Sequence, residues 1–87
     1  MSNSDFELLH FTATWCQPCK KIVPIILSFI EQMVGIKYTK VDVDDNIEKA
    51  KEYNVLSVPT LIVLKNNKII ARHSGVVNEE QLAKLFK

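Results

Sequence analysis

The first half of the chain alternates a buried strand, a long amphipathic helix and a second strand, and few folds accommodate that order. Residues 6–12 are mostly apolar and partly aromatic, which predicts a buried strand. Apolar side chains recur at steps of three and four in residues 19–34 and predict a largely buried helix. Residues 36–44 alternate and are rich in β-branched side chains, which predicts another strand. Two strands joined by a long helix are expected to be parallel, with a right-handed crossover.

Local signals mark where the helices begin and end. Pro24 removes a backbone donor inside the first helix, so we expect a kink there. Gly35 is a natural C-terminal stop. Asp45 and Glu48 are spaced like a capping box, which predicts a short helix after Asp45. The residues of that helix that are expected to face inward are Ile47, Ala50 and Tyr53.

The second half of the chain predicts a hairpin and a final helix. Residues 60–65 and 68–74 have strand composition, and the Asn-Asn pair at 66–67 tolerates the positive φ of a two-residue turn. Asn78 followed by Gln81 has the spacing of another helix N-cap. The sequence therefore predicts an α/β fold with the order βαβαββα.

Length and composition limit the class of protein. With 87 residues, the chain is expected to form a single domain over residues 1–87. The 11 basic and 10 acidic residues balance, so no strong positive field for nucleic acid exists. The longest apolar run, residues 22–27, is interrupted by Pro24 and is far too short for a membrane span. The polar start gives no secretory signal, so we expect the protein in the cytoplasm. We also expect it to be a monomer that binds neither nucleic acid nor a membrane.

The two cysteines are three positions apart, at Cys16 and Cys19. A disulfide between them closes a very small loop and constrains the unfolded chain little, so it is not a structural staple. In a reducing compartment, such a pair indicates redox chemistry or half of a metal site.

The position of the pair, between the first strand and the first helix, favours redox chemistry. At a helix N-terminus, free N–H groups and the positive end of the macrodipole stabilise a thiolate, which predicts a lowered pKa for Cys16. Cys19 lies one turn further along the same side, so it can reach Cys16. We expect Cys16 to be exposed and Cys19 buried. Pro18 suits the first turn, where a missing N–H costs nothing.

Two other interpretations of the cysteines are weaker. A structural zinc site needs four ligands, and His10 and His73 could complete one with Cys16 and Cys19. The local spacings match no usual zinc pattern, so we predict no metal. An inert pair of core cysteines is disfavoured because Cys16 falls at a strand–helix junction and not on an apolar face.

Several separate motifs together resemble the thioredoxin family over residues 6–87. Residues 15–20, Trp-Cys-Gln-Pro-Cys-Lys, resemble the family's Trp-Cys-Gly-Pro-Cys-Lys, with Gln17 in place of glycine. Pro24 falls where the family has a helix-kinking proline. Residues 58–60, Val-Pro-Thr, resemble the family segment whose proline is cis, and Gly75 matches a glycine beside the substrate groove.

The chain departs from the family pattern in three places. It begins at what would be the second strand, so we expect a four-stranded mixed sheet, flanked by helices and lacking the usual first strand and helix. Residues 36–44 would then form an edge strand. His10 stands where the family usually has a buried aspartate, and Thr12 stands where many members have a second tryptophan.

The resemblance implies a thiol–disulfide oxidoreductase that reduces protein disulfides without a bound cofactor. Cys16 would attack the substrate disulfide, and Cys19 would resolve the mixed disulfide. A thioredoxin reductase or a similar dithiol donor would restore the thiols. The residues implied to contact substrate are Trp15, Gln17, Pro18, Val58, Pro59 and Gly75.

The resemblance also implies roles for His10 and Lys40 as a proton-accepting pair beneath Cys19. Burial and a nearby ammonium both disfavour the imidazolium, so His10 is predicted to be neutral, with a lowered pKa. A neutral imidazole is able to act as a general base. The alternative is that His10 fills space and hydrogen-bonds a neighbouring group.

Two alternative functions remain open at this point. One is a glutaredoxin-like protein reduced by glutathione, which the short chain favours and the Trp-Cys-x-Pro-Cys motif disfavours. The other is a redox-inactive binding module with the same fold.

Overall fold

The seven predicted elements are present in the predicted order. The computed structural model describes residues 6–87. The elements are β1 (Phe6–Thr12), α1 (Gln17–Gln32), β2 (Ile36–Asp42), α2 (Ile47–Glu52), β3 (Thr60–Lys65), β4 (Lys68–Ser74) and α3 (Glu79–Lys84). Within residues 6–87, no helix is both long enough and apolar enough to cross a membrane.

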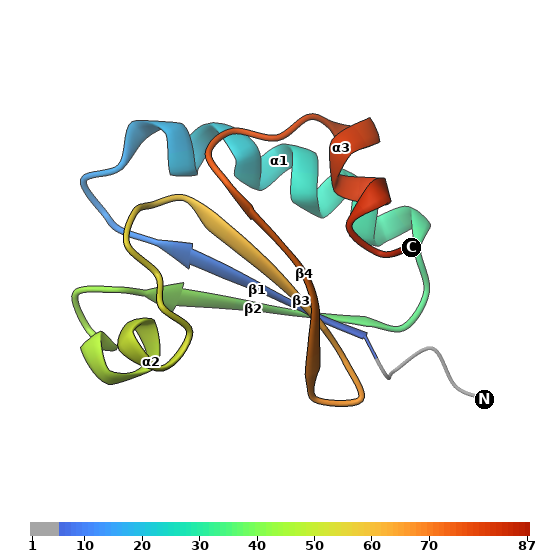
Figure 1. The fold of residues 1–87 in the computed structure, drawn as a ribbon. Helices are drawn as coiled ribbons and strands as arrows, with labels where there is room; N and C mark the ends of the chain where they lie inside the picture. Colours follow the sequence, from blue (N-terminus) through green and yellow to red (C-terminus); the bar gives the residue numbers. More distant parts are fainter. Residues whose placement is uncertain (1–5) are drawn as a thin grey trace.

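The four strands form one mixed sheet in the order β2-β1-β3-β4 (Figure 1). β1 pairs in parallel with β2 and antiparallel with β3, and β4 pairs antiparallel with β3. The register places His10 opposite Lys40 and Thr12 opposite Asp42. The predicted four-stranded sheet is confirmed, with β2 at one edge.

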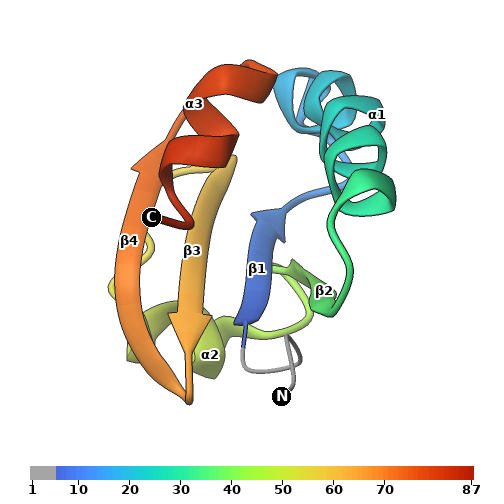
Figure 2. The same cartoon turned by 90° about the vertical axis from the view of Figure 1, so that its right-hand side faces the viewer.

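Helices cover the two faces of the sheet unequally. α1 and α3 lie together on one face, and α2 lies on the other (Figures 1 and 2). Because side chains alternate along a strand, β1 sends Leu8 and His10 toward α1 and sends Leu9 and Phe11 toward α2. The buried cluster beneath α1 and α3 contains Leu8, Ile22, Ile26, Phe29, Leu61, Val63, Val77 and Leu82. The cluster on the α2 face contains Leu9, Phe11, Val41, Ile62 and Leu64.

Helix α1 is amphipathic rather than largely buried, so that prediction was wrong. Its buried residues are Cys19, Ile22, Ile26 and Phe29, whereas Leu27 is half-exposed. The helix ends at Gln32, and Met33 adopts an extended conformation. Met33 and Val34 therefore leave the helix and lie on the surface. Pro24 lies within the helix, as placed from the sequence.

Helix α2 begins later than its predicted cap. Asn46, not Asp45, holds the N-cap position, and its side chain makes no capping hydrogen bond. The preceding strand ends at Asp42, whose carboxylate accepts the Asp44 N–H at 2.8 Å, and this local turn displaces the helix start. Ile47 is mostly exposed, so the prediction that it faces inward was wrong.

The signals in the last third of the chain are confirmed. Asn66 and Asn67 form the hairpin turn with φ values of 53° and 67°. Asn78 and Gln81 form a complete capping box, because each side chain accepts the other residue's backbone N–H, at 2.7 and 3.0 Å. Both features depend on contacts within a few residues.

Candidate active site

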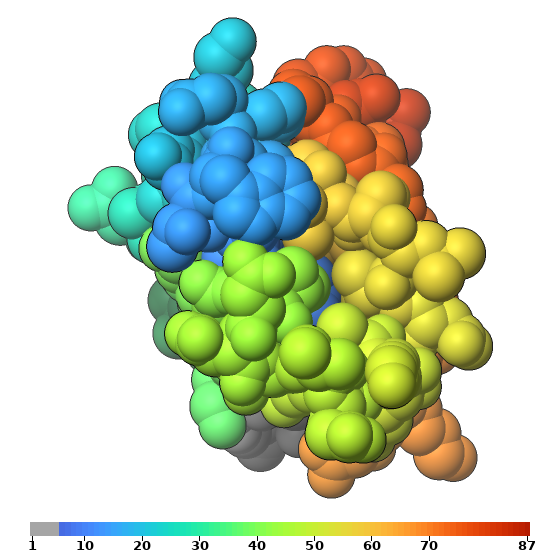
Figure 3. Space-filling view, turned by 90° about the vertical axis from the view of Figure 1, so that its left-hand side faces the viewer, coloured from blue at the N-terminus to red at the C-terminus, as the bar shows by residue number. Residues whose placement is uncertain are grey.

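The cysteine pair lies at one end of the sheet, where three segments far apart in sequence meet. These are the segment after β1, the segment after β2 and the segment before β3 (Figure 3). Ala13, Cys16 and Cys19 form a buried cluster, and Val43 and Val58 pack against it. The strand order therefore brings the predicted Val58 to the predicted cysteines.

Cys16 and Cys19 are joined by a disulfide, with their Cα atoms 5.3 Å apart. Cys16 is the N-cap of α1, and its Sγ accepts the Cys19 backbone N–H at 3.1 Å. Cys19 is completely buried, as predicted. Cys16 retains only 4% exposure, so the prediction of an exposed Cys16 was wrong for the disulfide form, because Ala13 and Val58 pack around it.

Trp15 stands beside the disulfide with 65% of its surface exposed. Its Nε1–H donates to the Asp44 carboxylate at 2.9 Å, which ties the segment after β1 to the segment after β2. The ring also borders a shallow pocket of about 190 Å³ together with Val43, Val55 and Val58. A large apolar side chain is thus held in place at the surface and not sequestered in the core.

Val58, Pro59 and Gly75 form the other side of the site. The Val58–Pro59 peptide bond is cis. The buried Pro59 accepts the Gly75 backbone N–H at 2.8 Å, which joins the start of β3 to the end of β4. Gly75 has φ +97°, and the space where a Cβ would stand is open. Glycine is therefore required here by the backbone conformation and not by crowding.

Gln17 and Pro18 occupy the first turn of α1, between the two cysteines. Both side chains are exposed. They lie on the outer surface of the site, within reach of any molecule that approaches Cys16.

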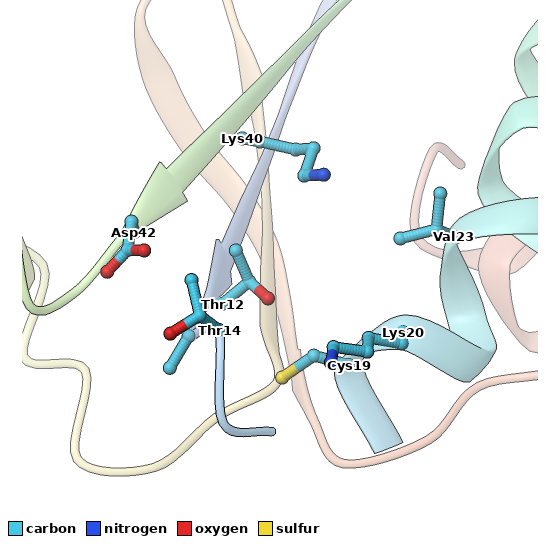
Figure 4. A pocket seen from close by; sticks show the side chains of 8 residues that line it. Thr12, Thr14, Cys19, Lys20, Val23, Lys40 and Asp42 are labelled. Carbon is cyan, nitrogen blue, oxygen red and sulfur yellow. The ribbon is translucent and has the colours of Figure 1, made fainter. Parts of the chain in front are cut away.

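A pocket of about 400 Å³ lies on the Cys19 side of the disulfide, between the sheet and α1 (Figure 4). The lining side chains include Thr12, Cys19, Lys20, Val23, Lys40 and Asp42. Figure 4 shows the Lys40 side chain reaching from β2 toward Val23 on α1. The pocket brings the polar side chains of Thr12, Lys40 and Asp42 to the Cys19 side of the disulfide, although Cys19 itself is buried.

His10 lies next to this pocket along β1 and is fully buried. Its Nδ1 is 2.9 Å from the Tyr38 hydroxyl, and its Nε2 has no hydrogen-bonding partner among residues 6–87. Burial, together with the charge of Lys40, lowers the His10 pKa from its ordinary value of 6.5 to about 4. The prediction of a neutral His10 beside Lys40 is confirmed.

The alternative of a metal site gains no support. Among residues 6–87, no three metal-ligating side chains of histidine, cysteine, aspartate or glutamate gather in one place. His73 lies on β4, where its Nε2 contacts the Val76 carbonyl at 3.1 Å.

Three residues of this region were missed from the sequence. Tyr38 is one of them, and its hydroxyl contacts His10. Asp44 holds Trp15, and Leu56 is 95% exposed beside Val58. Leu56 carried a detectable signal, because it is an apolar residue in a segment without helix or strand periodicity. Tyr38 and Asp44 carried none, since their partners are 28 and 29 residues away.

Known proteins share this architecture and this motif. The family model described as thioredoxin matches residues 1–87. A thioredoxin of Haemophilus influenzae is 40% identical over 83 residues, which cover 93% of this chain and 78% of the relative. A thioredoxin of Bacillus subtilis is 42% identical over 80 residues, which cover 90% and 76%. The oxidised mitochondrial thioredoxin 3 of Saccharomyces cerevisiae superposes with a TM-score of 0.85 at 34% identity, covering 92% of this chain and 74% of that one.

Proposed function

Since the chain belongs to the thioredoxin family and is a thiol–disulfide oxidoreductase, we propose that it works as a reductase of protein disulfides. The family acts on disulfide substrates and depends on a reducing partner in general. The observation that carries the proposal is the Cys16–Cys19 pair at the N-terminus of α1, beside an exposed Trp15.

Cys16 is the proposed nucleophile. Its Sγ caps α1 and already accepts an N–H from Cys19, and the first turn carries no acidic residue. These features stabilise negative charge on this sulfur. The Cys16 thiolate attacks a substrate disulfide, one substrate sulfur leaves as a thiolate, and a mixed disulfide remains.

Cys19 is the proposed resolving thiol. After losing its proton, it attacks Cys16 Sγ, which breaks the mixed disulfide and forms the Cys16–Cys19 bond. The two electrons pass to the substrate, which leaves with both its sulfurs reduced. A Cys19→Ser variant should therefore retain substrate on Cys16 as a stable mixed disulfide. If a Cys16→Ser variant retains it on Cys19 instead, the two roles are reversed.

The substrate is proposed to lie across Trp15, Val58, Pro59 and Gly75. The exposed Trp15 and the neighbouring Leu56 provide an apolar surface, and Val58 packs against the disulfide. The segment before β3 offers backbone groups to which a substrate strand could pair. Gln17 and Pro18 would contact the substrate from the α1 side.

His10 is proposed to accept the Cys19 proton, directly or through water in the adjoining pocket. The side chains of His10 and Cys19 both belong to the layer between the sheet and α1. At a pKa of about 4, His10 keeps a free lone pair across the physiological range. Burial, and after it the charge of Lys40, disfavours the imidazolium and so keeps His10 neutral. A base this weak would hold the proton only briefly before passing it on.

The test is the reduction of insulin disulfides by dithiothreitol, followed as turbidity with and without the protein. Precipitation that does not accelerate would contradict the reductase function. The recycling partner is tested in the same assay by replacing dithiothreitol with a thioredoxin reductase system or with glutathione. We expect the reductase to support turnover and glutathione to be ineffective.

The reduction potential decides the direction of the reaction. In this fold it ranges from roughly −270 mV in reducing proteins to roughly −120 mV in strong oxidants. We expect a reduction potential near the reducing end, because we place the protein in the cytoplasm, where thiols are kept reduced. We expect the protein to act there as a monomer. A value near the oxidising end would indicate an oxidase.

A further inference from the structure

Tyr38 is the hydrogen-bonding partner of the His10 ring within residues 6–87. The Tyr38 hydroxyl lies 2.9 Å from Nδ1, and the two rings are nearly parallel, at 15°, with centroids 6.2 Å apart. The other ring nitrogen, Nε2, is buried without a partner among these residues. The two nitrogens of one imidazole therefore have very different surroundings.

A neutral imidazole carries its proton on one nitrogen only, so two arrangements have to be compared. With the proton on Nε2, the Tyr38 hydroxyl donates to Nδ1 and a buried N–H is left without an acceptor. With the proton on Nδ1, that N–H donates to the Tyr38 oxygen, and Nε2 retains a free lone pair. Buried N–H groups without acceptors are rare, and under-satisfied acceptors are less so, which favours the proton on Nδ1.

We propose that Tyr38 is a positioning residue that holds His10 with its proton on Nδ1, which leaves Nε2 free to accept the Cys19 proton. The inference rests on the proposed role of His10 as proton acceptor. When Cys19 S–H passes its proton to Nε2, the Nδ1–H···O bond to Tyr38 stays in place. The Cys19 thiolate then displaces the substrate thiolate from Cys16, and the imidazolium returns its proton to that thiolate or to water.

The surroundings of the pair support this arrangement. Burial raises the pKa of Tyr38 to about 12, so its hydroxyl remains neutral at any pH where the protein works. The other ionisable groups on this side are Lys40 and Asp42 on β2 and Cys19 and Lys20 on α1, which line the neighbouring pocket. None of them makes a hydrogen bond to His10 that competes with Tyr38.

His73 provides an internal reference for the measurement. Its Nε2 lies 3.1 Å from the Val76 carbonyl, which only accepts hydrogen bonds. His73 therefore carries a proton on Nε2. The two histidines of the chain should show opposite patterns when neutral: Nδ1 protonated in His10 and Nε2 protonated in His73.

The first test is a long-range ¹H–¹⁵N correlation spectrum of the ¹⁵N-labelled oxidised protein at neutral pH, with His73→Gln to assign the two rings. We expect an unprotonated Nε2 and a protonated Nδ1 in His10. A protonated Nε2 in His10 would overturn the proposal. That result would leave the redox roles of Cys16 and Cys19 untouched.

The second test compares Tyr38→Phe with Tyr53→Phe, since these are the two tyrosines of the chain. The reduced protein reacts with an aromatic disulfide that releases a coloured thiol, first on attack by Cys16 and then on attack by Cys19. The Nδ1–H···O bond to Tyr38 also stabilises the imidazolium that forms when Nε2 takes the Cys19 proton, and losing one hydrogen bond of ordinary net strength slows such a step by roughly fivefold to tenfold. We expect Tyr38→Phe to slow the second release by that factor, to leave the first unchanged and to alter the His10 nitrogen pattern. Tyr53→Phe should change neither release.

A His10→Gln variant separates the role of His10 as proton acceptor from the role of Tyr38 as its positioning residue. If His10→Gln slows the second release and Tyr38→Phe does not, the positioning role of Tyr38 is wrong and His10 remains the acceptor. If neither variant slows it, both roles are wrong. All rates are referred to the folded fraction of each variant.

Discussion

The two faces of the sheet are built from the same strands but have different contents. The face toward α2 buries an apolar cluster around Leu9 and Phe11, and its buried polar residue, Thr60, lies opposite Phe11 at the start of β3. The face toward α1 buries His10 between Leu8 and Thr12 and borders a pocket whose lining includes Thr12, Lys40 and Asp42. Since alternate residues of β1 serve both faces, one seven-residue strand packs into both core clusters and places His10 on the α1 side.

The division between the faces is tested most strongly by a cavity on the α2 side. Phe11 is completely buried, and its ring packs against Tyr53 with centroids 5.8 Å apart. We expect Phe11→Ala to lower the free energy of unfolding by about 3–5 kcal/mol. The measurement is urea denaturation, with Phe11→Leu as a milder control. Insulin reduction per folded molecule should stay within about threefold of the parent, and a larger loss would show that the faces are not independent.

On the α1 side, the buried neutral His10 should make the free energy of unfolding depend on pH in acid. The unfolded chain protonates His10 near its ordinary pKa of 6.5, whereas the folded protein resists protonation until about pH 4. The unfolded state therefore binds more protons between these values, so the stability contributed by neutral His10 is complete above pH 6.5 and is lost as the pH falls toward 4. The loss is about 3 kcal/mol.

Denaturation of the oxidised protein and of His10→Gln over this pH range measures that contribution. Carboxylates titrate in both proteins, so the difference between the two curves isolates His10. Parallel curves would mean that the folded protein protonates His10 as readily as the unfolded chain does.

The smallest expected effect concerns Lys40. Its charge is the second cause of the lowered His10 pKa, after burial. We expect Lys40→Met to raise the pKa of His10 to a value between about 4 and 6.5, because burial remains. An NMR titration of the His10 ring protons measures it. Lys37→Met is the control, since Lys37 is exposed on the same strand and alternates to the other face. An unchanged pKa in Lys40→Met would show that the charge of Lys40 does not reach the ring.

Local sequence signals predicted those parts of the structure that depend on neighbouring residues. The capping box of Asn78 and Gln81 and the turn at 66–67 are of this kind. The apparent capping box at Asp45 failed for an equally local reason, because Asp42 takes the Asp44 N–H and displaces the helix start. Where two local patterns compete within a few residues, spacing alone does not identify the one that forms.

Predictions that depended on tertiary packing were less complete. A periodic apolar stripe identified α1 but did not show that Leu27 would remain half-exposed, since only one side of the helix rests on the sheet. The motifs placed Cys16 and Cys19 at the junction of strand and helix. The partners of His10 and Trp15 depend on strand register and on the segment after β2, which local patterns do not encode.

The position of β1 in the sheet has a consequence for the order of folding. Among the strands of residues 6–87, β1 precedes the other three, yet it lies between β2 and β3 and pairs with both of these later strands. The β3–β4 hairpin is closed by a two-residue turn, whereas the pairing of β1 with β3 joins residues about fifty positions apart and costs more chain entropy. A chain that has formed only the hairpin has not yet brought Cys16 to Val58. The rate at which a sample reduces protein disulfides therefore measures its fraction of fully folded molecules. Amide hydrogen exchange in β1 should report the same fraction.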